Sequence, residues 1–381
     1  MTQRDIIFVA NEVNELGGVA RWQALMAELF AESGHRVTIV GIAPPEVPMD
    51  LGDNPPFATV TLYDERPPGR RQVRSLSDRA NLKARRRESL REAGMRQAAE
   101  RLSAVFRAAR PGAMIIVTQV WAMEWVAAAD TAGHPVIGMS HESYEYSRGS
   151  SRFQRVEKYY RDIDRLLLLT REDADLWIGR GLNNVGYMPN PLPMMPEVPS
   201  RRTEKIVASI GRLGHQKGID MLLDTWAEAA PKHPDWRLKI YGSGPDEEAL
   251  RQQCTRLGLD GSVEWAGQTD DVAGALRGAS VFVQSSRGEG FPLALLEAMA
   301  CAVPCAAFDC APGVREIVRD EEDGLLARPG NVSELANRLG RLMEDAELRD
   351  TMGELARKNV QRYSPAAIRE RWEELFTFLE R

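Results

Sequence analysis

The chain has 381 residues, of which 43% are hydrophobic and 27% are charged, with a formal net charge of −6. These values are ordinary for a globular protein and, with the length, favour two domains over one. The longest apolar runs are too short to cross a bilayer, and the start "MTQRDIIFVAN" lacks the longer apolar region and cleavage site of a signal peptide. We therefore expect a cytoplasmic protein.

Short apolar runs alternate with amphipathic stretches along the whole chain. In the first half the runs cover residues 5–11, 36–42, 114–119, 135–140 and 165–170. In the second half they cover residues 205–211, 237–244, 262–267, 280–286 and 304–309. Amphipathic stretches such as "VARWQALMAELFAESG" separate most of them. Apolar strands that alternate with helices predict parallel sheets covered on both faces.

The glycine pair Gly17–Gly18 lies between the first predicted strand and the first predicted helix. Such a pair allows a phosphate to approach the backbone, but it lacks the G-x-G-x-x-G spacing of a dinucleotide site. A simple tight turn is the alternative interpretation.

A strongly basic segment follows. Residues 66–110 hold 14 Lys and Arg against four Asp and Glu, a net charge of +10, which leaves −16 for the rest of the chain. Its later part is amphipathic, and the face with Leu90, Ala98, Leu102, Val105 and Ala109 is expected to pack on the first domain. Three consecutive arginines, Arg85, Arg86 and Arg87, precede that face and are expected to be exposed. The segment is either a solvated helix face or a patch that recruits an anionic partner.

His141 follows the fourth apolar run of the first half, in "GMSHESYEYS". At the carboxyl end of a parallel strand, a histidine is placed to bond a substrate hydroxyl or a developing charge. Taken alone, a structural histidine is the stronger interpretation.

The stretch "MPNPLPMMPEVPSRRTEK" holds five prolines between Pro189 and Pro199. Such density continues neither a helix nor a central strand, so the stretch is predicted to be the linker between two domains. Beyond it, "SIGRLGHQKGID" places Arg212 and Lys217 in a glycine-containing loop after a strand. Two cations at a strand end are suited to a diphosphate, although surface cations are common.

The segment "RGEGFPLALLEAMAC" carries Glu289 and Glu297 with seven residues between them. The first is expected in the loop after a buried strand, and the second inside the helix that begins near Pro292. Free amides at that helix start attract phosphate, and Gly288 and Gly290 allow a ligand close to the backbone. Carboxylates beside such a site are suited to neutral sugar hydroxyls. A solvated loop glutamate and a helix-surface glutamate are the alternative.

Three of the four cysteines lie close together, Cys301, Cys305 and Cys310. A metal site is disfavoured, because the stretch holds no histidine and the chain has no C-x-x-C pair. Small buried apolar residues are the better interpretation. At the C-terminus, Ser364 and Pro365 predict a helix start, and its apolar stripe (Ile368, Trp372, Leu375, Phe376 and Leu379) requires a large packing partner.

Together these motifs resemble the retaining glycosyltransferases of GT-B architecture, and most closely family 4. "EGFPLALLE", the E-x7-E element, is the most specific part, and "ELGGVAR", "MPNPLP", "GRLGHQKG" and "EDGLLARPG" occur in the expected order. The resemblance implies two Rossmann-like α/β domains with parallel sheets that face each other across a cleft. Residues 1–190, joined by a C-terminal helix at 364–381 that crosses back, would bind the acceptor, and residues 191–363 would bind the nucleotide-sugar donor.

The resemblance also implies roles for single residues. Arg212 and Lys217 would bind the donor diphosphate, Glu297 the ribose, and Glu289 the hydroxyls of the transferred sugar. His141 would lie beside the anomeric centre, and with Glu289 it is assigned to catalysis. The remaining residues assigned to the donor are Gly17, Gly18, Gly290, Phe291, Pro292 and Leu293. The family needs no divalent metal and no other cofactor, because cations and helix amides stabilise the diphosphate.

The expected reaction moves a hexose or N-acetylhexosamine from a nucleotide-diphosphate sugar, with UDP preferred over GDP, to a hydroxyl, with retention of configuration. The acceptor would be an anionic polymer, a lipid-linked molecule or a small molecule, bound near Arg85, Arg86 and Arg87, with peripheral contact to the inner face of the cell membrane. There is a faint further resemblance to enzymes that decorate teichoic acids or capsular polymers. Nucleic acid is disfavoured as a partner, because the basic segment has almost no aromatic residues.

Two other interpretations of the sequence remain open, and a third is less favoured. A GT-B epimerase acting on UDP-linked sugars would need acid and base residues that the sequence does not identify, and it would lack an E-x7-E element. A non-catalytic sugar-nucleotide-binding protein would not need all five of Arg212, Lys217, Glu289, Glu297 and His141. A nicotinamide dehydrogenase is the least favoured, since no G-x-G-x-x-G follows a strand.

Overall fold

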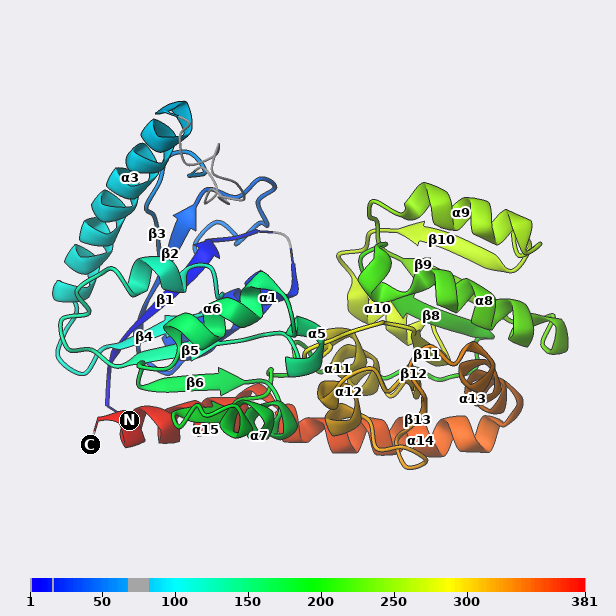
Figure 1. Ribbon diagram of the computed structural model, residues 1–381. Helices are drawn as coiled ribbons and strands as arrows, with labels where there is room; N and C mark the ends of the chain where they lie inside the picture. The colour runs from blue at the N-terminus through cyan, green and yellow to red at the C-terminus, as the bar shows by residue number, and fades with distance from the viewer. Residues whose placement is uncertain (1, 16, 68–81, 381) are drawn as a thin grey trace.

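The computed structural model describes residues 2–15, 17–67 and 82–380, with the side chains of residues 82–85 left out. It contains two parallel sheets, each with helices on both faces (Figure 1). The first sheet has seven strands in the order β3-β2-β1-β4-β5-β6-β7, and the second has six in the order β10-β9-β8-β11-β12-β13. These are two Rossmann-like α/β domains, as the sequence predicted.

The first sheet and its helices come from the N-terminal half of the chain. Its strands are β1 (Asp5–Glu12), β2 (Arg36–Ala43), β3 (Ala58–Thr61), β4 (Met114–Val117), β5 (Val136–Met139), β6 (Arg165–Leu168) and β7 (Val185–Tyr187). The helices are α1 (Gly18–Glu32), α3 (Leu82–Arg107), α4 (Met123–Val126), α5 (Tyr144–Ser147), α6 (Ser151–Tyr159) and α7 (Arg171–Gly179).

The second sheet follows the proline-rich stretch. Its strands are β8 (Ile206–Ile210), β9 (Arg237–Tyr241), β10 (Val263–Gly267), β11 (Val281–Gln284), β12 (Cys305–Phe308) and β13 (Gly324–Ala327). The helices are α8 (Ile219–Ala229), α9 (Glu247–Arg256), α10 (Val272–Arg277), α11 (Leu293–Ala300), α12 (Pro312–Ile317), α13 (Val332–Glu344), α14 (Ala346–Asn359) and α15 (Pro365–Leu379). Short 3-10 turns are η1 (His215–Lys217), η2 (Ala230–Lys232) and η3 (Val360–Tyr363). Within the described residues, no helix is long and apolar enough to span a membrane.

All ten predicted apolar runs form strands, and three strands were not predicted. β3 is exposed along its whole length, so it carries no apolar signal. β7 has only three residues, one of them buried, which is too short for a pattern. β13 is buried and as long as several predicted strands, so its apolar run was overlooked. Residues 188–203 contain neither helix nor strand, as the prolines require.

Strand alternation in β1 divides the first core into two layers. Ile6 and Phe8 lie in the same hydrophobic cluster as Trp22 of α1 and Trp372 of α15. Ile7 and Val9 lie instead in the cluster formed with α3, α4 and α7. The first of these clusters continues into the second domain through residues of β11 and α11. One apolar core therefore joins the two domains.

Helix α3 packs on the first domain through its C-terminal part, as predicted, but the prediction for Leu90 was wrong. Ala98 and Leu102 are buried, with Val105 and Ala109 packed beside them, whereas Leu90 is 67% exposed. Most described residues from Arg86 to Ala93 are exposed, so the described part of the chain leaves this portion of α3 largely uncovered.

The last helix crosses from the second domain to the first. α14 lies beneath the second domain and α15 continues beneath the first (Figure 1). The Ser364 hydroxyl caps α15 by accepting from the Ala367 amide, with Pro365 in the first turn. Trp372 and Phe376 are fully buried against Phe30, at ring-centroid distances of 5.8 and 5.5 Å. Burial of two such side chains stabilises the crossing by roughly 3–6 kcal/mol.

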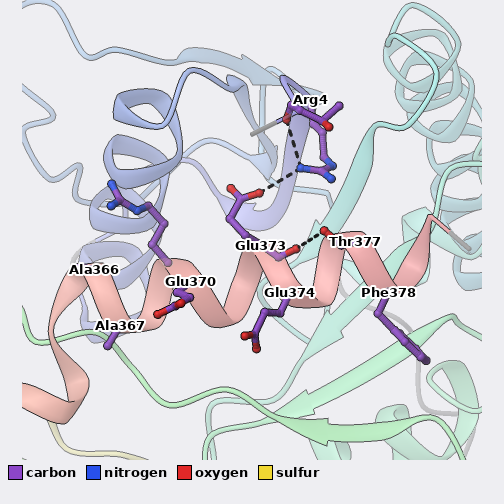
Figure 2. Close-up of a pocket in the computed structure, with 10 residues that line it drawn as sticks. Arg4, Ala366, Ala367, Glu370, Glu373, Glu374, Thr377 and Phe378 are labelled. Atoms are coloured by element: carbon purple, nitrogen blue, oxygen red, sulfur yellow. Dashed lines mark hydrogen bonds and ion pairs between the residues drawn. The ribbon is translucent and has the colours of Figure 1, made fainter.

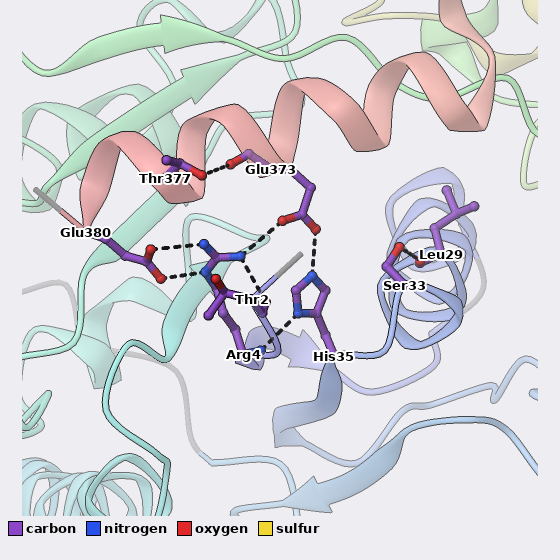
Figure 3. Close-up of polar contacts among 8 residues, drawn as sticks. All are labelled: Thr2, Arg4, Leu29, Ser33, His35, Glu373, Thr377 and Glu380. Atoms are coloured by element: carbon purple, nitrogen blue, oxygen red, sulfur yellow. Dashed lines mark hydrogen bonds and ion pairs between the residues drawn. The ribbon is translucent and has the colours of Figure 1, made fainter.

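Polar contacts fasten the same helix to the start of β1 (Figure 3). The Arg4 guanidinium donates to both carboxylate oxygens of Glu380, at 2.6 and 3.0 Å, and to Glu373 at 3.1 Å. The Arg4 amide donates to Nδ1 of His35 at 3.1 Å, so the ring proton is on Nε2, which donates to Glu373 at 2.6 Å. Hydrogen bonding to Arg4 lowers the pKa of Glu380.

We predict that Arg4→Ala destabilises the protein by about 2–4 kcal/mol, because it leaves the Glu373 and Glu380 carboxylates without their guanidinium partner in a largely buried place. The measurement is urea unfolding followed by tryptophan fluorescence. Lys205→Ala is the matched control, since it breaks an exposed pair with Asp235 and should cost no more than about 0.5 kcal/mol. Equal losses of stability in the two variants would contradict the stabilising role of the Arg4 contacts with Glu373 and Glu380.

Candidate active site

The loops that follow β8 and β11 lie side by side at one edge of the second sheet. The two strands are parallel neighbours, so their carboxyl ends meet. The Arg287 amide donates to the Gln216 carbonyl at 2.8 Å, and the Gln216 side chain donates back to the Gly288 carbonyl at 2.9 Å. The Ser285 hydroxyl donates to the Gly218 carbonyl at 2.8 Å. The two motifs singled out in the second half of the sequence therefore form one structural unit.

Glu289 is buried in this unit rather than solvated. Its side chain is 7% exposed and accepts from Lys217 Nζ at 2.7 Å and from the Ser286 hydroxyl at 2.6 Å. The sequence analysis assigned Lys217 to a phosphate and Glu289 to sugar hydroxyls. The structure brings the two side chains into direct contact, with Lys217 still 30% exposed.

Glu297 is also buried, as the fifth residue of α11. Its side chain is 2% exposed, and its carboxylate accepts from Arg21 Nη2 of α1 at 2.7 Å. Burial raises the pKa of Glu297, and the Arg21 charge and hydrogen bond act against that rise. The alternative of a helix-surface glutamate is therefore wrong, and so is that of a solvated loop glutamate at position 289.

Glycines in the E-x7-E segment allow the first domain to approach the backbone. A Cβ on Gly290 would lie 1.9 Å from the His141 carbonyl oxygen, and a Cβ on Gly288 would lie 2.0 Å from the Tyr146 ring. Both contacts are too close for any real Cβ. The sequence analysis explained these glycines by the approach of a ligand, whereas in the structure they accommodate the chain after β5.

His141 lies at this contact, at the carboxyl end of β5. Its ring packs on Trp22 of α1 at a centroid distance of 4.9 Å. Within the described part of the chain, its Nε2 atom is buried without a hydrogen-bond partner. Burial lowers the pKa of His141 to about 4, so the ring is neutral at physiological pH. A neutral imidazole can exchange hydrogen bonds with a hydroxyl group.

The other residues assigned to the donor site differ in how far they are exposed. Arg212 is exposed at the start of the loop after β8. A Cβ on Gly17 or Gly18 would meet no atom within 4 Å, so the N-terminal end of α1 is open to an approaching group. Pro292 is the N-cap residue of α11, one position earlier than expected. The Phe291 ring, in contrast, packs on Tyr363 at 5.1 Å and is 4% exposed, so it supports the loop from inside.

Sequence reasoning missed Arg21 and Trp22, which contact Glu297 and His141 from the first domain. Arg21 stands in the quoted motif "ELGGVAR", but nothing in the sequence pairs it with a residue 276 positions away. Both residues line a cavity of about 210 Å³ between α1, the proline-rich stretch and the start of α11. The other lining residues are Ala24, Leu25, Glu28, Met49, Pro191, Pro193 and Leu293.

A larger hollow of about 900 Å³ lies elsewhere, along α15 (Figure 2). Arg4, Glu370, Glu374 and Phe378 are among the side chains around it, and none of its lining residues belongs to the loops after β8 and β11. It is therefore separate from the candidate site.

The cysteines are mostly apolar core residues, as expected. Cys254, Cys301 and Cys305 are buried, and Cys310 is half-buried. Burial raises the pKa of Cys301 and of Cys310 to about 12. Among the residues that the structure describes, no group of three or more His, Cys, Asp or Glu side chains is arranged to hold a metal ion.

Among the described residues of the basic segment, four arginines pair with acids of the first domain. Arg66 pairs with Glu12 and Glu46, Arg91 with Glu88 and Glu124, Arg107 with Glu100 and Asp130, and Arg110 with Asp5. Arg86 and Arg87 are exposed near the N-terminal end of α3, while the side chain of Arg85 lies outside the described residues. Within the described part of the chain, Arg86 and Arg87 are therefore the members of the arginine triplet that are placed to bind an anion. The basic residues at 70, 71, 74, 79 and 83 lie outside the part of the chain whose side chains are described.

Comparisons with known proteins agree with this architecture. The chain is 34% identical over 236 residues to an uncharacterized glycosyltransferase of Haemophilus influenzae, a match that covers 61% of this chain and 67% of the relative. It is 26% identical over 242 residues to the poly(ribitol-phosphate) alpha-N-acetylglucosaminyltransferase of Staphylococcus aureus, covering 62% of this chain and 48% of that protein. The chain thus spans from about half to two thirds of the length of these curated relatives.

A solved structure of S. aureus TarM, in complex with fondaparinux, alpha-GlcNAc-glycerol and UDP, has the same fold. The TM-score is 0.79 at 15% identity, over 98% of this chain and 100% of that one. The profile of the family described as "Glycosyl transferases group 1" matches residues 194–359, the part that carries the loops after β8 and β11 and both glutamates of the E-x7-E element. The chain belongs to the glycosyltransferases, and its residues 194–359 form a group 1 domain.

Proposed function

We propose that this chain transfers a hexose or N-acetylhexosamine from a UDP-sugar to a hydroxyl of an anionic polymer or lipid-linked acceptor, with retention of configuration. The observation that carries the proposal is the pair of buried carboxylates, Glu289 and Glu297. Lys217, in the loop after β8, holds the first, and Arg21 of α1 holds the second. The His141 backbone lies against Gly290, between the two glutamates in the sequence. Buried charged groups without a structural explanation are characteristic of ligand sites.

The donor would lie along the loops after β8 and β11. Lys217 and Arg212 supply positive charge for a diphosphate, together with the amides at the start of α11. Lys217 is already bonded to Glu289, so one cation would serve the leaving diphosphate and also orient the sugar-binding carboxylate. These groups would stabilise the departing diphosphate without a metal ion.

The neutral His141 ring would bond a hydroxyl of the transferred sugar near the anomeric carbon. Its Nε2 atom, buried without a partner among the described residues, supports this role, because such an atom costs free energy until a ligand bonds it. Retention would follow the family 4 pattern, in which the acceptor attacks from the face that the diphosphate leaves. No enzymic nucleophile is assigned.

UDP and an anionic acceptor are supported by the similar proteins. TarM was solved with UDP, and the S. aureus relative is named for transfer to poly(ribitol-phosphate). A second relative is named poly(glycerol-phosphate) alpha-glucosyltransferase. The exposed arginines at the N-terminal end of α3 would attract such a phosphate-containing polymer. The deciding experiment is a screen of binding and hydrolysis across UDP-, GDP- and ADP-sugars, and failure of every donor would overturn the proposal.

We predict that Lys217→Ala and Arg212→Ala each lower kcat/KM for the donor by about 2–4 kcal/mol of transition-state stabilisation, since each removes a charge that faces the diphosphate. Lys205→Ala is the matched control, because this cation precedes β8 at the opposite edge of the sheet and pairs with Asp235. Unchanged steady-state kinetics in both test variants would refute the diphosphate assignment.

Calorimetry should separate the two glutamates. Glu297→Ala should weaken binding of UDP itself, because the ribose loses its hydrogen-bond acceptor. Glu289→Ala should leave UDP binding intact or tighter, because Lys217 is released from its carboxylate partner, and yet abolish most sugar transfer. Glu247→Ala, on the surface of α9, is the control. If Glu289→Ala weakened UDP binding and Glu297→Ala impaired only sugar transfer, the ribose and sugar roles would be exchanged. If neither variant changed UDP binding or transfer, both assignments would be refuted.

Charge reversal should test the acceptor surface. Arg85, Arg86 and Arg87 changed together to Glu should raise the KM for an anionic acceptor and spare donor hydrolysis, and added salt should weaken the wild type in the same way. The control reverses Lys232, Arg256 and Lys358, three exposed cations of the second domain, with the same change of net charge. Normal acceptor kinetics at low salt would show that the arginines form only a solvated face.

A further inference from the structure

The ion pair between Arg21 and Glu297 connects the two domains at the candidate site. Arg21 lies in the first turn of α1, and Glu297 lies in α11 of the second domain. The two side chains approach to 2.7 Å, with Glu297 2% exposed and Arg21 47% exposed. Within the described residues, Arg21 is the side chain that bonds the Glu297 carboxylate.

A carboxylate at this depth needs a cation to remain charged. Burial favours its neutral form, and removal of the only cationic partner leaves the full cost of desolvation. The charge state of the carboxylate determines which hydrogen bonds it can make with a sugar. An ionised carboxylate accepts hydrogen bonds at both oxygens, whereas a protonated one must use one oxygen as a donor. Two neighbouring ribose hydroxyls, as donors, need the ionised form.

The ion pair leaves one carboxylate oxygen of Glu297 without a bond to Arg21. A single guanidinium nitrogen, Nη2, contacts a single oxygen, Oε1, so the contact is not the two-pronged bond that would occupy both oxygens. The rest of the Arg21 side chain borders the cavity of about 210 Å³ beside Leu293. Arg21 therefore orients the carboxylate without covering it.

We propose that Arg21 is a positioning residue of the donor site, which holds Glu297 as an oriented anion for the ribose hydroxyls and so makes the first domain part of the ribose subsite. This proposal rests on the assignment of Glu297 to the ribose under the proposed function. It adds that a nucleoside diphosphate is bound tightly only when α1 is docked on α11.

Other charged groups around Glu297 do not replace Arg21. On the first-domain side, Glu28 lines the same cavity and would repel an anion. Toward the second domain, Arg277, Asp271 and Arg357 lie near Cys301 at the end of α11, whereas the charge that acts on the Glu297 carboxyl is Arg21. Arg357 is engaged by the carbonyls of Ala300 and Pro196. Without Arg21, the pKa of Glu297 should rise further, so its ionised form is lost as pH falls.

The test measures UDP binding by calorimetry with wild type, Arg21→Ala, Arg21→Lys, Glu297→Gln and the control Arg251→Ala, from about pH 5.5 to about pH 8.5. At neutral pH, Arg21→Ala should weaken UDP binding roughly 10- to 100-fold, and Arg21→Lys should restore most of it. The loss should grow as pH falls. UDP itself titrates near pH 6, so each variant is compared with wild type at the same pH.

Each outcome decides between the claims. Unchanged or tighter UDP binding by Arg21→Ala, with weaker binding by Glu297→Gln, would overturn the role of Arg21 and leave the proposed function standing. Unchanged binding by both would refute the ribose assignment of Glu297, and no UDP binding by wild type would refute the proposed donor. A loss in Arg21→Ala that is the same at every pH and not restored by lysine would show a merely structural contact. Melting temperatures confirm that each variant is folded.

Discussion

Burial of two carboxylates at one sheet edge is the constraint on which this site depends. Glu289 and Glu297 are both nearly excluded from solvent, and each is held by one cation. The cations come from different directions, Lys217 from the neighbouring loop and Arg21 from the other domain. A protein that only needed to be stable would do as well with apolar residues at both positions. The charges are therefore best understood through what they bind.

The same constraint explains why the domains meet where they do. Glycines at 288 and 290 bring the backbone of the E-x7-E segment against Tyr146 and the His141 carbonyl. A continuous apolar core and the crossing of α15 fix the first domain from the other side. The hydrogen bonds of Arg4 and His35 to Glu373 hold α15 in place. Parts of the chain far from the glutamates thus contribute to the position of His141.

The sequence identified what is local and missed what depends on the docking of distant parts. Strands, the linker and the Ser364 cap could be predicted because apolar runs and prolines act on their own neighbourhood. The E-x7-E element was placed correctly on a loop and a helix. Arg21 was missed, because its partner is set by the approach of two domains. The ring of Phe291 packs inward on Tyr363, which the sequence could not show, and its assignment to the donor remains a prediction. Leu90 was misplaced because helical spacing shows which residues share a face, but not how much of that face is covered.

A crystal structure of the chain with UDP tests the central claim most directly. The account predicts that the ribose hydroxyls bond the Glu297 carboxylate while Arg21 remains in contact with it, and that the diphosphate lies between Lys217, Arg212 and the start of α11. His141 would then face the open position where the sugar is attached. A nucleotide bound elsewhere, or bound with its phosphates away from Lys217 and its ribose away from Glu297, would contradict the account.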